Sequence, residues 1–170
     1  MKKVVLSLVL VAGVIAANAQ PRAIGVRFGY TTDVSYQHSL GSKNMLQLDA
    51  GFPGFSGFQV VGTYNWLIPI SSWQHAGSWN LYAGGGAGFG LGWRYGYNEE
   101  VYVASRKPYD AKFHGTLGVV GMFGAEYNFK FPLQVFADFR PLIGAVGSKN
   151  GVRFHTRGLF EFAVGARYRF

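Results

Sequence analysis

The carboxyl-terminal stretch decides the fold class of this chain. Residues 154–170 read FHTRGLFEFAVGARYRF, with apolar or aromatic side chains at most alternate positions up to Phe170. Because successive side chains of a β-strand point to opposite faces, this stretch has one apolar face and one face that carries Glu161, Arg167 and Arg169. Strands of soluble sandwiches usually end after about five or six residues. The greater length here is typical of a tilted strand that crosses a membrane.

The same alternation recurs through the rest of the chain. Seven earlier stretches share it, namely residues 24–30, 34–40, 46–50, 58–66, 79–94, 113–130 and 133–143. It is weakest in the second of these, where His38 falls on the apolar face. Eight alternating stretches in succession predict an all-β fold, an eight-stranded antiparallel up-and-down transmembrane β-barrel. A soluble barrel would have the opposite polarity, with its apolar face inside.

The connections between these strands alternate between the two ends of the barrel. With both termini in the periplasm, we expect periplasmic turns near residues 41–43, 69–78 and 130–132, and outer connections near residues 31–33, 53–56, 95–111 and 147–151. Trp79 and Trp93 would be separated by roughly 35 Å in height, at about 3.3 Å per residue and a tilt near 40°. We therefore expect two aromatic girdles, with Trp66, Tyr127, Phe129, Tyr168 and Phe170 beside Trp79, and Phe58, Phe113 and Phe154 beside Trp93.

The amino terminus has the pattern of an export signal. Lys2 and Lys3 precede a mostly apolar run from Val4 to Ile15, and Ala17-Asn18-Ala19 is a small-x-small sequence. This order predicts a signal peptide over residues 1–19 and a barrel domain over residues 20–170. The apolar run is shorter than the roughly 20 residues that a membrane-spanning helix needs.

Composition agrees with a β-rich wall in contact with something less polar than water. Aromatic residues make up 17% of the chain and charged residues only 14%. The formal charge of +8 is spread along the sequence without a lysine- or arginine-rich run, so we expect no nucleic-acid partner. Cysteine is absent, which excludes disulfides and thiolate metal sites.

The chain resembles the small outer-membrane β-barrel proteins of Bacteroidetes. The resemblance rests on residues 27–30 (RFGY), 62–66 (GTYNW), 79–86 (WNLYAGGG) and 124–129 (GAEYNF). The ending at residues 162–170 resembles the signal by which outer-membrane barrels are recognised for assembly, with Tyr168 and Phe170 as its aromatic residues. The resemblance implies an eight-stranded barrel of the outer membrane, and it brings neither catalytic residues nor a cofactor.

The polar face of the predicted strands carries most of the chemistry. Its charged residues are Arg27, Asp49, Glu126, Asp138, Arg140, Arg157, Glu161, Arg167 and Arg169. The interior of an eight-stranded barrel is just wide enough for side chains to fill. Unpaired buried charges are costly, so we expect an interior network of ion pairs that plugs the lumen. The alternative is a narrow polar conduit or a ligand site.

Other candidate sites are weaker. Gly84, Gly86, Gly88, Gly90 and Gly92 form an inward stripe that lacks the strand-to-helix context of a phosphate-binding loop, so it is expected to make room for bulky neighbours or to let the wall bend. The four histidines have no metal-ligand spacing, and only His114 and His155 would share one end of the lumen. Ser105, His155 and Glu161 are far apart in sequence and do not form a recognisable catalytic set.

The sequence thus predicts an outer-membrane barrel with a filled polar lumen and a structural or interaction role, without catalytic, cofactor or metal residues. The loop at residues 95–111, with mixed charges and tyrosines, suits either partner binding or contact with lipopolysaccharide. Expected partners are outer-membrane lipid, lipopolysaccharide, the barrel-assembly machinery and an unidentified protein. The alternatives are a lipid-modifying enzyme, a narrow pore for small solutes, and an accessory subunit of a larger complex.

Overall fold

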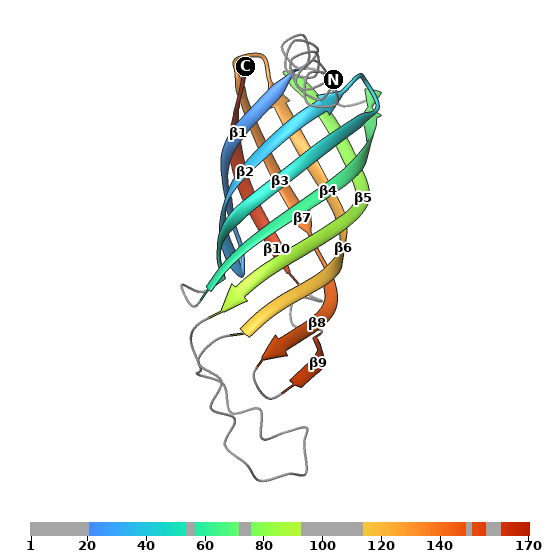
Figure 1. Cartoon of the computed structure of the whole chain (residues 1–170). Helices are drawn as coiled ribbons and strands as arrows, with labels where there is room; N and C mark the ends of the chain where they lie inside the picture. Colours follow the sequence, from blue (N-terminus) through green and yellow to red (C-terminus); the bar gives the residue numbers. More distant parts are fainter. Residues whose placement is uncertain (1–20, 54–56, 72–75, 93–113, 149–150, 156–160) are drawn as a thin grey trace, which may run out of the picture.

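The architecture is that of a tall, tilted barrel built from antiparallel strands, as seen in a computed structural model (Figure 1). The structure describes residues 21–53, 57–71, 76–92, 114–148, 151–155 and 161–170. Its strands are β1 (Arg22–Phe28), β2 (Thr31–Leu40), β3 (Asn44–Pro53), β4 (Gly57–Ile70), β5 (Gly77–Gly92), β6 (His114–Phe129), β7 (Leu133–Phe139), β8 (Leu142–Ser148), β9 (Gly151–His155) and β10 (Phe162–Arg169). None of the described ranges holds a helix long and apolar enough to cross a bilayer.

The sheet closes on itself through neighbours in an up-and-down order. Each strand from β1 to β6 pairs with the next along the chain, and β10 pairs with both β7 and β1. The pairing of β1 with β10 closes the barrel, with Val26 opposite Ala166. Arg22 also exchanges two main-chain hydrogen bonds with Phe170. The predicted eight-stranded antiparallel barrel is confirmed.

The seventh strand of the barrel consists of β7 and β8. Both pair with β6 in one unbroken register, since Phe123 opposes Phe139 and Val120 opposes Leu142. The interruption falls at Pro141, which has no N–H to donate, although its carbonyl accepts a 2.9 Å bond from Gly121. The strand predicted at residues 133–143 therefore continues to Ser148.

The eighth strand consists of β9 and β10, which pair with β8 and β7 respectively. His155 opposes Gly144 and Phe162 opposes Phe139, so the last strand advances seven positions while its neighbour advances five. The last strand therefore has two residues more than its neighbour between these two pairs. Because side chains alternate with a period of two, an even surplus keeps the same residues facing inward on both sides of it.

One predicted connection is wrong. The first outer turn was expected at residues 31–33, but β1 ends at Phe28 and β2 begins at Thr31. The turn consists of Gly29 and Tyr30, and Gly29 donates a 3.0 Å bond to the carbonyl of Thr31. Thr31 and Asp33 consequently belong to the wall and lie on its inner face, where both are buried. The turn at residues 41–43 lies as expected, with Gly41 at a φ of 79° that favours glycine.

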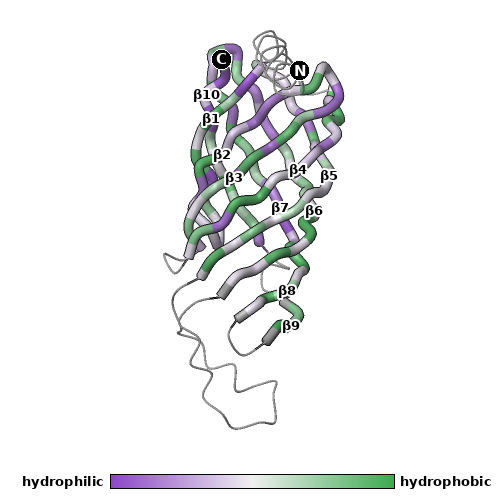
Figure 2. Tube along the Cα trace, viewed as in Figure 1, coloured by the Kyte–Doolittle hydropathy of each residue, from purple (hydrophilic) through white to green (hydrophobic). Residues whose placement is uncertain are grey.

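The barrel is polar inside and apolar outside. Hydrophobic and hydrophilic residues alternate along its strands (Figure 2). The largest fully buried side chains are Arg27, Arg140 and Arg167, whereas Leu117 and Val119 on the outer face are exposed by 66% and 68%. Within the lumen, Met45, Tyr82 and Met122 form a small apolar cluster. This polarity is the reverse of that in a soluble barrel.

Glycines lie opposite the long polar side chains of the lumen. The cross-strand pairs are Arg27 with Gly165, Arg167 with Gly25, Asp138 with Gly124, Asp33 with Gly51, and Asn65 with Gly84. A Cβ at Gly165 would overlap the ring of Phe136, and one at Gly124 would overlap the ring of Tyr82. The missing side chains therefore supply the space in which the lumen residues pack.

Candidate functional site

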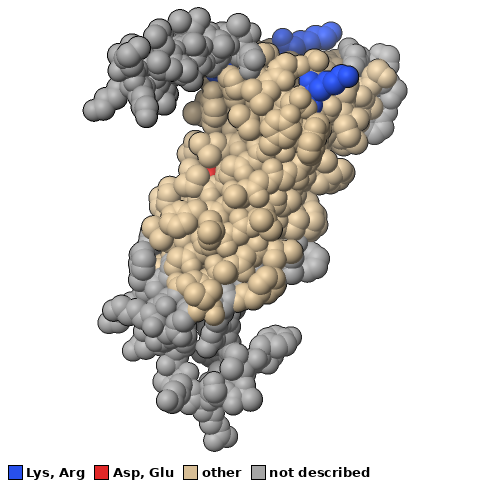
Figure 3. Space-filling model, turned by 45° about the vertical axis from the view of Figure 1, so that its right-hand side comes forward, with Lys and Arg blue, Asp and Glu red and all other residues tan. Residues whose placement is uncertain are grey.

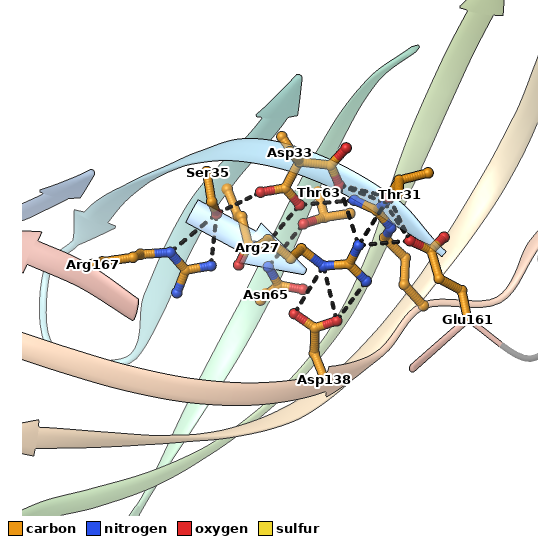
Figure 4. Close-up of polar contacts among 12 residues, drawn as sticks. Arg27, Thr31, Asp33, Ser35, Thr63, Asn65, Asp138, Glu161 and Arg167 are labelled. Atoms are coloured by element: carbon orange, nitrogen blue, oxygen red, sulfur yellow. Dashed lines mark hydrogen bonds and ion pairs between the residues drawn. The ribbon is translucent and has the colours of Figure 1, made fainter. Parts of the chain in front are cut away.

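The centre of the lumen is an ion-pair network around Arg27 (Figure 4). Arg27 comes from β1 and contacts Asp138 of β7, with 2.7 Å between Nη2 and Oδ1 and 3.1 Å between Nε and the same oxygen. Its Nη1 lies 2.6 Å from Oε1 of Glu161 and 3.2 Å from Oδ2 of Asp33. The guanidinium of Arg27, on β1, therefore links this strand to β2, to β7 and to Glu161, the residue that precedes β10.

Arg140 completes the same network from the other side. It lies between β7 and β8, and its Nη2 is 3.0 Å from Asp33 Oδ2 and 2.9 Å from Glu161 Oε1. Its Nη1 is 2.9 Å from Oδ2 of Asp49 on β3. Asp33 and Glu161 are thus each shared between two arginines. Ion pairs of this kind with several hydrogen bonds offset the cost of removing charges from water.

The hydroxyl of Thr31 lies where the two arginines and two of the carboxylates meet. It is within 2.9 Å of Asp33 Oδ2 and 2.8 Å of Glu161 Oε1, and it accepts from Arg27 at 3.3 Å and from Arg140 at 3.1 Å. Thr31 is 1% exposed, so these neighbours have displaced water around it. A hydroxyl can donate to a carboxylate and accept from a guanidinium group, so it suits a position that has both as neighbours.

A second network lies along the lumen and joins Arg167 to Glu126 through two glutamines. Arg167 donates to Oε1 of Gln134 at 3.2 Å and to Oε1 of Gln37 at 3.5 Å. The amide groups of the same glutamines donate to Oε2 of Glu126 at 2.8 and 3.1 Å. Asn80 and Asn128 donate to the other oxygen of Glu126 at 2.9 and 3.3 Å. The carboxylate is therefore held by four carboxamides.

Arg167 is fixed by further contacts. Its Nε and Nη2 lie 3.0 and 2.9 Å from Ser35 Oγ, and its guanidinium carbon is 3.6 Å from the centre of the Phe136 ring. Ser35 in turn donates to Oδ1 of Asp49 at 2.5 Å, which connects the second network to the first. The two networks form one continuous polar plug through the lumen.

The plug contains more acid than base. The buried charged residues of the described chain are three arginines and five carboxylates, a formal sum of −2. Within the described ranges, the carboxylates form no group that could hold a metal ion. Arginines separate the acids of the first network, and carboxamides surround Glu126, so the arrangement fills space and fixes strands relative to one another.

The structure brings most of the predicted lumen residues together. Arg27, Asp49, Asp138, Arg140 and Glu161 lie in the first network, and Glu126 and Arg167 in the second. Arg169 lies apart at the barrel end, where its Nη2 donates to the carbonyls of Phe129 and Phe131 at 2.6 and 3.3 Å. Arg157 lies outside the described residues. Tyr168 and Phe170 lie on the outer face, exposed by 58% and 60%.

Sequence reasoning missed several members of the plug, namely Thr31, Asp33, Ser35, Gln37 and Gln134. The predicted strand begins at Val34, which leaves Thr31 and Asp33 in the predicted turn. Extending the alternation backwards from Ser35 would have placed both on the inner face. The uncharged members have no charge to distinguish them in the sequence, although they alternate with apolar residues in the same register.

The glycine stripe has two different roles along β5. A Cβ at Gly84 or Gly86 would overlap the main chain of β4, so these residues permit a close approach of the two strands. A Cβ at Gly88 would lie 3.1–3.3 Å from Leu142, Val120 and Val61, which pack over it instead. Of the remaining candidates, Ser105 and the side chains of His114 and His155 lie outside the described residues.

Comparison with known proteins adds one structural likeness. No family model and no curated protein matches the chain. Among solved structures, it is similar to a major outer membrane protein from Thermus thermophilus, with 13% sequence identity and a TM-score of 0.49, over 89% of this chain and 99% of that chain. The assignment of the barrel fold rests on the strand pairing of the chain itself.

Proposed function

We propose that this protein is an integral outer-membrane β-barrel whose lumen is closed by its own side chains and whose role is structural or interactive. The observation that carries the proposal is the inverted polarity of the wall. Arg27 and Arg167 are fully buried, while apolar side chains cover the outside. An apolar surface of this extent is unfavourable in water and favourable in lipid.

The dimensions of the apolar wall support a bilayer environment. Leu117 and Phe129 lie on the outer face of β6, twelve positions apart. At about 3.3 Å per residue and a tilt near 40°, they are separated by roughly 30 Å, close to the thickness of a hydrocarbon core. Trp79 packs on Tyr127, and Tyr127 on Phe129, with ring centroids 4.9 and 4.7 Å apart. Such an aromatic girdle is typical of a membrane interface.

The barrel fold supports a proposal for the cellular location and the partners of this protein. A bacterial barrel of this kind reaches the outer membrane after export, so we infer that residues 1–19 are a cleaved signal peptide. We propose that Tyr168 and Phe170 are read by the barrel-assembly machinery. Phospholipid and lipopolysaccharide would then contact the wall.

The continuous plug favours a non-conducting barrel over a narrow pore. Ion passage would require Arg27, Arg140 and their carboxylates to separate, and each broken pair would leave buried charges without partners. Nothing in the described lumen favours a lipid-modifying enzyme, because its carboxylates are bound to arginines and carboxamides.

Two measurements test the proposal. We expect the folded protein to migrate differently on gels before and after boiling and to have a β-rich circular dichroism spectrum. In planar bilayers we expect no sustained single-channel current from the native protein, and measurable openings from the Arg27→Ala/Arg140→Ala variant. A water-soluble monomer without a mobility shift would refute the membrane assignment, and steady native conductance would refute the plug.

A further inference from the structure

We propose that the terminal end of the barrel carries a cationic ring that binds the headgroups of anionic phospholipids. This inference rests on the proposed membrane location. The ring consists of Lys43 in the β2–β3 turn, Lys130 in the β6–β7 turn and Arg22 at the start of β1. Lys43 and Lys130 are exposed, and Arg22 is half-buried on the outer face.

The three cations are spread at even intervals over half of the circumference of the barrel. From the β2–β3 turn to the β6–β7 turn, four strands intervene in either direction, so Lys43 and Lys130 lie on opposite sides. Arg22 lies at the junction of β1 and β10, two strands from each lysine. A ring of this geometry faces lipid in several directions at once, as expected for headgroup contacts and not for a single docked protein.

No aspartate or glutamate of the described ranges lies on the outside of the barrel. All five acidic residues of the described ranges are buried in the lumen, none more than 5% exposed. On the face shown in Figure 3, lysine and arginine lie at one end of the described barrel, and the wall below shows no lysine or arginine and only a small acidic spot. Over the described outer surface, the charges at this end are therefore positive, which attracts anionic headgroups.

Aromatic residues lie beside the cationic ring at the same end. Trp66 is exposed by 56%, and Phe131, Tyr168 and Phe170 are also exposed. Tryptophan and tyrosine at this level place the adjacent charges among headgroups and not within hydrocarbon. The turns of this end are short, which identifies it as the periplasmic end of an outer-membrane barrel. The ligand is therefore a phospholipid of the periplasmic leaflet.

Lipid selectivity measured by fluorescence quenching tests the ring directly. The Trp73→Phe/Trp93→Phe protein, which retains Trp66 and Trp79, is folded into phosphatidylcholine vesicles with increasing brominated phosphatidylglycerol or, in parallel, brominated phosphatidylcholine. We expect about a fivefold preference for phosphatidylglycerol, the ratio that one basic residue near an anionic surface contributes. The preference should fall markedly in Lys43→Gln/Lys130→Gln, which keeps only Arg22 of the ring, and it should be lost at about 1 M salt, where charges are screened beyond about 3 Å.

A matched control removes the same charge elsewhere. Lys107→Gln/Lys112→Gln alters the connection between the far ends of β5 and β6, and it should keep the native preference. Equal quenching by both lipids in the native protein, or a preference that is undiminished in Lys43→Gln/Lys130→Gln, would overturn the cationic ring. Failure of the protein to acquire a heat-modifiable fold in pure phosphatidylcholine would instead overturn the membrane location itself.

Discussion

Arg167 and Glu126 are joined across the lumen by two glutamines, each of which accepts from the arginine and donates to the carboxylate. The amide dipoles of Gln37 and Gln134 thus align between a positive and a negative group. An ion pair with intervening carboxamides spans more of the barrel interior than a direct contact would. It also fixes the orientation of both amides, since only one orientation satisfies both charges.

The bridged pair predicts an energetic coupling that depends on the glutamines. In a double-mutant cycle of Arg167→Met and Glu126→Gln, we expect a coupling energy of about 1–3 kcal/mol. In a Gln37→Leu/Gln134→Leu background the coupling should fall by at least half, because the bridge is gone. Urea unfolding in lipid vesicles, followed by tryptophan fluorescence, provides each free energy. A coupling that is unchanged without the glutamines would refute the bridge.

The plug predicts unequal roles for two arginines. Arg140→Met leaves Asp33, Asp49 and Glu161 without one of their cations, and we expect a loss of about 3–5 kcal/mol in the free energy of unfolding. Arg169→Met removes bonds to main-chain carbonyls at the barrel end and should cost less than half as much. Equal losses in the two variants would show that the buried network contributes no more to the free energy of unfolding than the bonds at the barrel end.

The two roles of the β5 glycines predict different tolerances within one strand. Gly86→Ala places a methyl group against the main chain of Gly62 and Thr63, which cannot move aside independently, so we expect a loss of about 3 kcal/mol or more. Gly90→Ala meets its nearest atoms at 3.6–3.8 Å and should cost less than about 1 kcal/mol. Folding yield and unfolding free energy should rank the two variants in this order, and the reverse ranking would contradict the close strand approach.

Depth in the bilayer predicts the cost of a charge on the outer wall. Phe123, exposed on β6 between Leu117 and Phe129, lies near the middle of the apolar belt. Phe123→Lys should destabilise the folded protein in vesicles by about 2–4 kcal/mol, whereas Phe131→Lys at the barrel end should cost less than about 1 kcal/mol. The same variants in a short-chain detergent provide the comparison. Similar costs at both positions would be inconsistent with a wall embedded in lipid.

The fold could be predicted from sequence because the inside and outside of a strand are set by parity alone. Once Arg167 and Glu161 are placed on one face of the last strand, every other residue of β10 is assigned without knowledge of its neighbours. The same reasoning placed Arg27, Asp49 and Asp138 in the lumen. It failed at Asp33 only because the start of β2 was set three residues too late.

The contacts within the lumen could not be predicted because they depend on the relative heights of strands. Arg27 and Glu161 are 134 residues apart in sequence, and their 2.6 Å contact requires the stagger of β1 against β10 around a closed barrel. The pairing of Arg27 with Gly165 has the same origin. Parity identifies the two faces of each strand, but the register of the closed sheet decides which residues meet.

The surplus of two residues between β9 and β10 restricts how the chain length can change there. A single inserted or deleted residue that shifted the parity of β10 would move Arg167 to the outer face and Tyr168 into the lumen, so it would have to be absorbed before β10 begins. A change of two residues would leave every inward residue inward. Even-numbered changes of length in this part of the wall need no such compensation, so homologous barrels should differ there by two or four residues more often than by one or three.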